Sequence, residues 1–321
     1  MNRPHIPQAV LDAAHARKAA RLGRDWAEAD RLKGVIEAAG WRVVDRGADF
    51  ALSPLHSVDV IESGWTRYGW SGAVPSRLEE PAGTHATVVV RVADDPAAVA
   101  RGRSFLAAAP ADTQLILVAD APTADAAAAI EVTLSAGLPA VEVVWLAQRS
   151  GLAAAWNAGV RRASGAVIIL AGDGVAATGD AVSSVVRVLA DPSVAVGGAV
   201  GLAGPVVQDL APDPALRGSV AALDDTLLAA RREDVASCAP LDEAYLTPRI
   251  LAAWWSLRLR AGAPPGARPR AAVVIPVPVV DRSGTIAPPG ATAGSTDGSD
   301  EERRLRRDLR RFADRRPEAR Y

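Results

Sequence analysis

The stretch VEVVWLAQRSGLAAAWNAGVRRASGAVIILAG, residues 141–172, contains the pattern that decides the fold. The apolar, valine- and isoleucine-rich runs at 141–147 and 166–172 are typical of strands, and the alanine-rich run at 152–163 is typical of a helix. A strand, a helix and a second strand in this order form a parallel crossover unit. The stretch therefore predicts an α/β domain.

The same alternation continues on both sides of this stretch. Strands are predicted at 86–92 and 114–120, helices at 95–108, 123–136 and 180–191, and a further apolar run follows at 193–200. We therefore expect a mostly parallel sheet flanked by helices. In such sheets ligands bind beyond the carboxyl ends of the strands, so the residues that follow each strand are the first candidates for a site.

A different pattern precedes the sheet, at residues 7–52. Apolar residues at helical spacing predict two helices, with Asp25 as the N-cap of the second and Gly40 just after its end. Two short strands joined by a polar turn at 45–49 follow. The segment is therefore predicted to form a helical hairpin followed by a β-hairpin.

These patterns divide the chain into five parts. We place the N-terminal unit at residues 1–55, an ordered linker at 56–83, the main domain at 84–282, a flexible linker at 283–300 and a charged helix at 301–321.

Composition limits the partners and the location of the protein. Its 36 Lys and Arg and 37 Asp and Glu give a net charge of −1, so we do not expect a nucleic-acid partner. Cys238 is the single cysteine, which excludes an intrachain disulfide. No apolar signal core is present at the N-terminus, and the longest uncharged apolar run is too short for a transmembrane helix. We therefore expect a cytoplasmic protein without a transmembrane segment.

Polar side chains follow three of the predicted strands. DAPTAD, residues 120–125, comes after the second strand, GLAAAWNAG, residues 151–159, after the third, and AGDG, with Asp173, after the fourth. Further along, LDEAYLTP opens a tryptophan-rich segment, LAAWWSLRLR, that is predicted to be helical. Asp173 stands between two glycines, so a turn residue and a metal ligand are both open interpretations.

This order of motifs resembles family 2 glycosyltransferases of the GT-A fold, over about residues 84–280. The resemblance implies transfer of a sugar from a nucleotide diphosphate sugar to an unknown acceptor. It implies nucleotide binding by Asp120, Asp125 and Asn157, an Mg²⁺ or Mn²⁺ ion held by Asp173, and a catalytic base at Asp242 or Glu243.

The catalytic motifs depart from the pattern of that family at three places. Trp156 stands where the family has an arginine, AGDG supplies one acid instead of two, and Ala252 takes the place of an acid. Because alanine cannot accept a proton, two functions stay open. One is an active glycosyltransferase, and the other is an inactive binding or scaffold protein with the same fold.

The N-terminal segment ARLGRDWAEADRLKGVIEAAGWRVVDRGADFALSP resembles the C-terminal part of cysteinyl-tRNA synthetases. No other signature of a synthetase is present. We therefore interpret residues 7–52 as a packing or dimerisation hairpin and as a candidate binding site for a protein partner, in preference to the tRNA binding that the resemblance implies.

Overall fold

The computed structural model describes residues 6–47, 49–62, 64–204, 209–238, 240–262, 270–281 and 298–314. The chain divides into two compact units, residues 1–61 and 62–321, and each is described by itself. The described residues include no helix that combines the length and the apolar character needed to span a bilayer.

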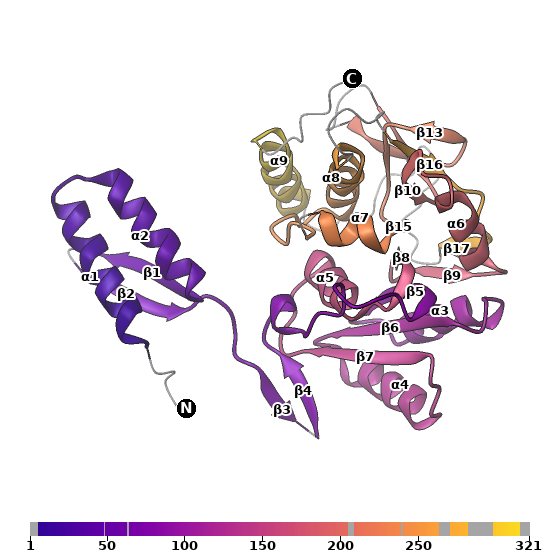
Figure 1. Ribbon diagram of the computed structural model, residues 1–321, viewed down its shortest axis with the longest axis horizontal. Helices are drawn as coiled ribbons and strands as arrows, with labels where there is room; N and C mark the ends of the chain where they lie inside the picture. Colours follow the sequence, from indigo (N-terminus) through magenta and orange to yellow (C-terminus); the bar gives the residue numbers. More distant parts are fainter. Residues whose placement is uncertain are drawn as a thin grey trace. The chain divides into compact units, whose positions relative to one another are not determined.

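The N-terminal unit is a helical hairpin followed by a β-hairpin, as predicted (Figure 1). Its elements are α1 (Gln8–Leu22), α2 (Trp26–Ala38), β1 (Trp41–Arg46) and β2 (Asp49–Pro54), and the two strands pair antiparallel. The Asp25 side chain accepts a hydrogen bond from the Glu28 amide, which satisfies one of the free donors at the start of α2.

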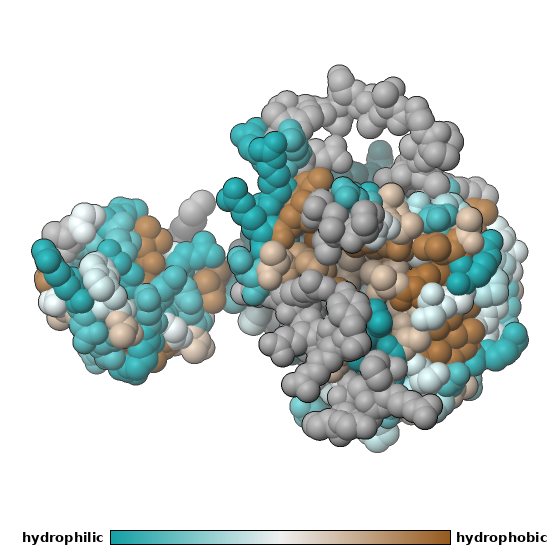
Figure 2. Space-filling model, turned by 90° about the horizontal axis from the view of Figure 1, so that it is seen from above, coloured by the Kyte–Doolittle hydropathy of each residue, from teal (hydrophilic) through white to brown (hydrophobic). Residues whose placement is uncertain are grey.

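A small core and several ion pairs hold this unit together. Ile36 is fully buried between the helices and the hairpin, and Arg17 donates to Asp45 at 2.7 Å. Hydrophilic residues cover most of the unit on the face seen in Figure 2, with apolar side chains among them. Trp26 is 57% exposed and lies under the Arg21 guanidinium, 5.6 Å from its ring centre.

The large unit is built on a ten-stranded sheet with the order β13-β16-β10-β15-β8-β5-β6-β7-β4-β3. Its strands are β3 (Val60–Glu62), β4 (Trp65–Tyr68), β5 (Thr84–Val92), β6 (Thr113–Asp120), β7 (Val141–Leu146), β8 (Gly165–Ala171), β10 (Val194–Gly198), β13 (Gly218–Val220), β15 (Leu227–Arg231) and β16 (Ala271–Val274). The ladders from β4 through β7, β6 and β5 to β8 are parallel, and β15 pairs antiparallel with β8 and β10. The predicted mostly parallel α/β sheet is therefore confirmed.

Shorter strands lie outside this sheet. They are β9 (Val175–Ala177), β11 (Gly201–Ala203), β12 (Ala211–Asp213), β14 (Ala222–Leu223) and β17 (Val279–Asp281). Pairing of β9 with β17 brings the segment after β8 beside the segment around residue 281.

Helices cover both faces of the sheet, and each face has its own core (Figure 1). One core contains residues of α5 (Leu152–Arg162), α7 (Arg232–Ser237) and α8 (Pro248–Ala261), and the other contains residues of α3 (Ala97–Ala107), α4 (Ala124–Ser135) and α6 (Ala181–Leu189). Alternate residues of one strand point to opposite cores: Val89 packs under α5, whereas Val88 and Val90 face α3. This two-sided burial explains why the strands are apolar at nearly every position.

Close packing of α5 on the sheet depends on Gly159. A Cβ at this position would overlap the Val89 side chain. The glycine of the predicted motif therefore allows the helix to lie close to β5.

The segment 56–83, predicted as an ordered linker, supplies strand β4 to the sheet. Arg67 and Tyr68 pair with Trp145 and Leu146 of β7, and the Arg67 guanidinium stacks 5.0 Å from the Trp145 ring centre. The segment thus carries a structural role in the large unit.

Helix α9 (Gly298–Asp314) covers the first part of the predicted charged helix at 301–321, and residues 315–321 lie outside the described part of the chain. Asp308 is fully buried and accepts hydrogen bonds from the amides of Leu246 and Thr247, the two residues before α8, at 2.9 and 2.7 Å. Phe312 of α9 joins the core of the α8 face. The predicted flexible linker at 283–300 falls outside the described residues except at its end, where α9 begins.

Candidate functional site

Asp120, Arg91 and Asp173 form a continuous charged chain at the carboxyl ends of β5, β6 and β8. Arg91 donates from Nε to Asp120 Oδ2 at 2.8 Å and from Nη1 to Asp173 Oδ2 at 3.0 Å. The parallel strands explain this grouping, because their carboxyl ends meet at one edge of the sheet. We call this group the edge triad.

Asp120 is the buried end of the edge triad. Its carboxylate has no exposed surface and accepts hydrogen bonds from the amides of Ser150 and Gly151, at 2.7 and 3.1 Å, at the start of α5. A carboxylate is favourable there, since free amides and the positive helix dipole meet at a helix N-terminus. Ala121 follows with φ of 43°, a left-handed conformation that non-glycine residues rarely adopt.

Two acids that sequence reasoning missed, Asp224 and Asp225, lie at the same edge. They come just before β15, and because β15 runs antiparallel to β8, its start lies beside the end of β8. The Gly172 amide donates to the carbonyl of Thr226 at 3.0 Å, which ties the two segments together next to Asp173.

Burial changes the ionisation of both acids. Desolvation, with repulsion from Asp225 and a contribution from Asp281, raises the pKa of Asp224 to about 7, although two hydrogen bonds from Thr226 oppose the shift. Desolvation, with repulsion from Asp173 and Asp281, raises the pKa of Asp225 to about 6. Asp281 is near because it pairs with Val175 in the β9–β17 ladder. We call Asp173, Asp224, Asp225 and Asp281 the edge acids.

The edge acids do not form a ready-made metal site. Within the part of the chain that the structure describes, no three His, Cys, Asp or Glu side chains lie close enough together to hold a metal ion. In addition, the Asp173 carboxylate is occupied by Arg91. The residues present therefore do not fit the Mg²⁺ or Mn²⁺ site that the sequence resemblance implies, and the role of Asp173 as a metal ligand stays a prediction.

Other arginines surround this edge. Arg101 donates from Nε to the Asp173 carbonyl at 2.7 Å and pairs with Asp95. Arg149 donates to the Ala121 carbonyl at 3.0 Å, and its guanidinium lowers the pKa of Asp94. The edge of the sheet therefore combines buried acids with several cations.

Two of the residues predicted to bind nucleotide do not belong to the edge triad. Asp125 is exposed in the first turn of α4. Asn157 is buried in α5, where it exchanges two hydrogen bonds of 2.9 Å with the backbone of Leu241 and donates a third to Glu243. The structure brings Asp120 and Asp173 together, whereas Asn157 joins the other predicted group, around residue 242.

Asp242 and Glu243, the predicted bases, are engaged by partners within the fold. Asp242 accepts two hydrogen bonds from Arg311 of α9, at 2.6 and 2.7 Å. Glu243 accepts from Asn157 at 2.9 Å and from the Ser71 hydroxyl. Their assignment as bases stays a prediction. We call Asp242, Glu243, Asn157 and Arg311 the loop cluster.

Two positions at which the sequence departs from the family pattern lie in the core. Trp156 and Ala252 have no exposed surface, and both belong to the core of the α8 face. An arginine or an acid at either position would require a buried partner for its charge.

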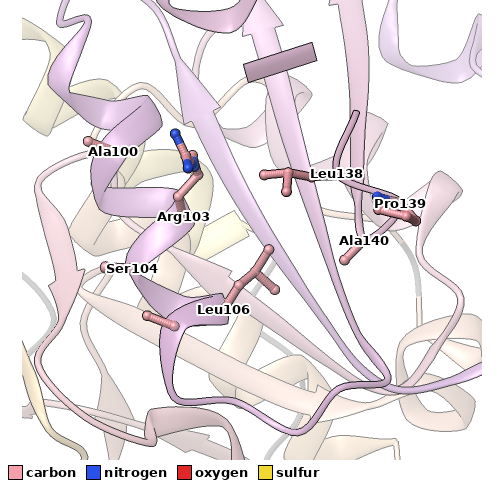
Figure 3. A pocket seen from close by; sticks show the side chains of 8 residues that line it. Ala100, Arg103, Ser104, Leu106, Leu138, Pro139 and Ala140 are labelled. Atoms are coloured by element: carbon pink, nitrogen blue, oxygen red, sulfur yellow. The ribbon is translucent and has the colours of Figure 1, made fainter. Parts of the chain in front are cut away.

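Two pockets of the large unit lie at the opposite edge of the sheet from these acids. One, of about 480 Å³, is lined by the end of α3 and by residues 138–140, just before β7 (Figure 3). The other, of about 500 Å³, contains the polar residues Gln114 and Glu142. Neither pocket includes an edge acid, and ligands of parallel sheets bind at the carboxyl ends.

About a third of the chain matches one protein family. Residues 101–215 match the family described as "Glycosyl transferase family 2". This range contains Asp120, Asn157 and Asp173 but ends before Asp224. No curated protein matches the chain.

Three solved structures resemble parts of the chain. The first is the mannosyltransferase PcManGT from Pyrobaculum calidifontis, in complex with GDP-Man and Mn²⁺ (16% identity, 62% of this chain, 57% of that chain, TM-score 0.46). The second is GalNAc-T7 with UDP, GalNAc and Mn²⁺ (14% identity, 68% and 46%, TM-score 0.49). The third is S. aureus TarS with UDP (13% identity, 60% and 58%, TM-score 0.45). In each case the matched part spans 46–58% of the other protein.

Proposed function

We propose that this protein is a glycosyltransferase that binds a nucleoside diphosphate sugar at the carboxyl edge of its sheet and transfers the sugar to an acceptor hydroxyl. The observation that carries the proposal is the meeting of Asp173 and Asp225 at the end of β8. Asp173 lies inside the region that matches the glycosyltransferase family. Asp225 adds a half-buried carboxylate to that region from a part of the chain about fifty residues later.

Transfer requires a group that accepts the proton of the acceptor hydroxyl. As the hydroxyl oxygen bonds to the anomeric carbon, the bond from that carbon to the diphosphate breaks and the diphosphate leaves with the electron pair. We assign the proton acceptor to Asp225, because burial and neighbouring acids raise its pKa to about 6. A base whose pKa lies near neutral pH is both ionised and basic enough to take the proton.

Donor binding is assigned to the loops around the edge triad. Asp120 fixes residues 150–151 at the start of α5, so its contribution is to hold the rim of the site in place. Asp125 is exposed on the neighbouring helix start and is proposed as a contact to the nucleoside. Asn157 is proposed to act indirectly, by holding the loop at residue 241.

A second candidate function is that of a non-catalytic binding protein. Ala252, at the place of a family acid, is fully buried in α8, so that position can present no base to a substrate. In this case the site would bind a nucleotide without turnover. The predicted protein partner of residues 7–52 would then be part of the function.

Calorimetry and a donor-hydrolysis assay test the proposal. The purified protein is titrated with UDP-, GDP- and dTDP-sugars, each with Mn²⁺ and with EDTA, and released nucleotide is then measured. We expect Asp225→Asn to bind the donor as the wild type does and to lose hydrolysis by about 100-fold or more. Asp242→Asn is the matched control and keeps hydrolysis within about twofold of wild type.

Each other outcome has a clear meaning. Absence of binding with every donor, in both conditions, would contradict the proposal. Binding without turnover in the wild type supports the second candidate. A loss of hydrolysis in Asp242→Asn, with Asp225→Asn unaffected, would show that Asp242 of the loop cluster is the catalytic base.

A further inference from the structure

We propose that Arg91 takes the place of the divalent cation in this site, so that the diphosphate of the donor is bound by a guanidinium and without a metal ion. This inference rests on the proposed function, because it concerns the same donor. It replaces the expected ion at Asp173 with a side chain of the protein itself.

The first observation is the position of Arg91 between two acids. It bonds to Asp120 at 2.8 Å and to Asp173 at 3.0 Å. Asp173, at the end of β8, is the acid that the family resemblance predicts to hold the metal ion. The guanidinium therefore already neutralises the carboxylate that a cation would need as a ligand.

The second observation is that Arg91 has a fixed anchor. Asp120 has no exposed surface and is itself held by the amides of Ser150 and Gly151. Because those partners belong to the start of α5, Asp120 cannot turn away without leaving its charge buried and unpaired. A metal ion at Asp173 would have to displace Arg91 from one acid or lie beside its positive charge.

The third observation is that Arg91 keeps the capacity to bind an anion. Its side chain is 18% exposed, and a guanidinium has five N–H donors, of which these two contacts use Nε and one Nη1 hydrogen. Planar guanidinium groups bind phosphate oxygens through paired hydrogen bonds. Arg101 and Arg149, at the same edge, add positive charge around the path of the leaving diphosphate.

Metal binding by the free protein is the first test. Mn²⁺ is titrated into the wild type and its free concentration is followed by electron paramagnetic resonance. We expect the wild type and Asp173→Asn to bind the same amount of Mn²⁺, because Asp173 holds no metal ion. A Mn²⁺ site in the wild type that is lost in Asp173→Asn would overturn the inference. This test needs no nucleotide.

Nucleotide binding with and without metal is the second test, with UDP and GDP as probes. For at least one of them we expect the same dissociation constant in EDTA and in Mn²⁺, within about twofold, and an affinity loss of about tenfold or more in Arg91→Met. Arg187→Met, on the exposed side of α6, is the matched control and leaves the affinity unchanged.

The outcomes separate this inference from the proposed function. UDP or GDP binding that requires Mn²⁺ and is lost in EDTA overturns the inference and leaves the proposed function in place. If neither probe nor any donor binds, the proposed function fails. In that case a Mn²⁺ site at Asp173 in the free wild type would also show that Arg91 does not take the place of the metal ion. Both wild-type measurements stand even if Arg91→Met does not fold.

Discussion

The loop cluster and the edge acids are both rich in carboxylates, but they use them in opposite ways. In the loop cluster each carboxylate has a dedicated donor: Asp242 has Arg311, and Glu243 has Asn157. Among the edge acids, Asp224 is buried and Asp225 is half-buried, and desolvation together with neighbouring carboxylates raises the pKa of both. Carboxylates with matched hydrogen-bond donors stabilise a fold. Crowded carboxylates have shifted pKa values, which suit them to act as acids or bases in catalysis.

The largest effect is expected when the loop cluster loses Asn157. Asn157→Ala removes three hydrogen bonds and leaves the buried backbone of Leu241 without its partner. We expect the free energy of unfolding to fall by about 3 kcal/mol, measured by urea denaturation. Asp125→Ala, at an exposed position of α4, is the control. An equal loss in both variants would show that the loop cluster is not a special support.

The next effect is expected at Asp242. Asp242→Asn weakens its two-fold pairing with Arg311 and should lower the free energy of unfolding by about 2 kcal/mol, because the carboxylate is only 9% exposed. Nucleotide affinity should not change. A variant as stable as the wild type but without donor binding would show that the two groups have been assigned the wrong way round.

Removing the charge of an edge acid should raise the free energy of unfolding, whereas the changes in the loop cluster lower it. The pKa of Asp224 is raised to about 7 in the folded protein, so its neutral form stabilises the fold below about pH 4, and this contribution is lost as the pH rises through about 7. Asp224→Asn keeps an oxygen to accept from Thr226 and has no charge to desolvate. We expect the variant to match the wild type at pH 4 and to be more stable by about 1–2 kcal/mol at pH 8.

Urea denaturation at both pH values measures this change. A variant that is less stable than the wild type at pH 8 would mean that the Asp224 carboxylate is well paired, and the contrast with the loop cluster would disappear.

The smallest effect is expected at Arg149. Its pair with Asp94 is exposed, with 40% and 71% of the two side chains accessible, so Arg149→Ala should cost less than about 1 kcal/mol. Thermal unfolding at low and high salt measures this cost. A larger loss that persists at high salt would place the Ala121 loop, to which Arg149 also donates, among the structural supports.

Much of the fold could be predicted because its strands are buried on both faces. The run at 86–92 became β5, and the unit at 141–172 became β7, α5 and β8, within a few residues of the expected bounds. Periodicity and apolar runs depend on local burial, and local burial is visible in a sequence.

Only part of the candidate site could be predicted from the sequence, and the reason is geometric. The rule that ligands lie beyond the carboxyl ends of parallel strands finds Asp120 and Asp173. It does not find Asp224 or Asp225, since they precede β15, an antiparallel strand, and reach the same edge from the other direction. The acid pair directly before an apolar run was the available signal.

The partner of Asp242 was hidden for another reason. Arg311 lies 69 residues further along the chain, in a helix for which the sequence predicted charge but no partner. No local pattern links the two residues, so the pairing appears only when α9 is seen beside α8.

The attachment of α9 also has a consequence for how the chain is made. The amides before α8 find their acceptor, Asp308, 62 and 61 residues downstream. Since domains begin to fold during synthesis from the N-terminus, the sheet can assemble on the ribosome while the start of α8 still lacks this buried contact. Completion of the large unit therefore requires α9 to have left the ribosome. A nascent chain that stalls before Asp308 would have all strands of the sheet but no acceptor for the amides of Leu246 and Thr247.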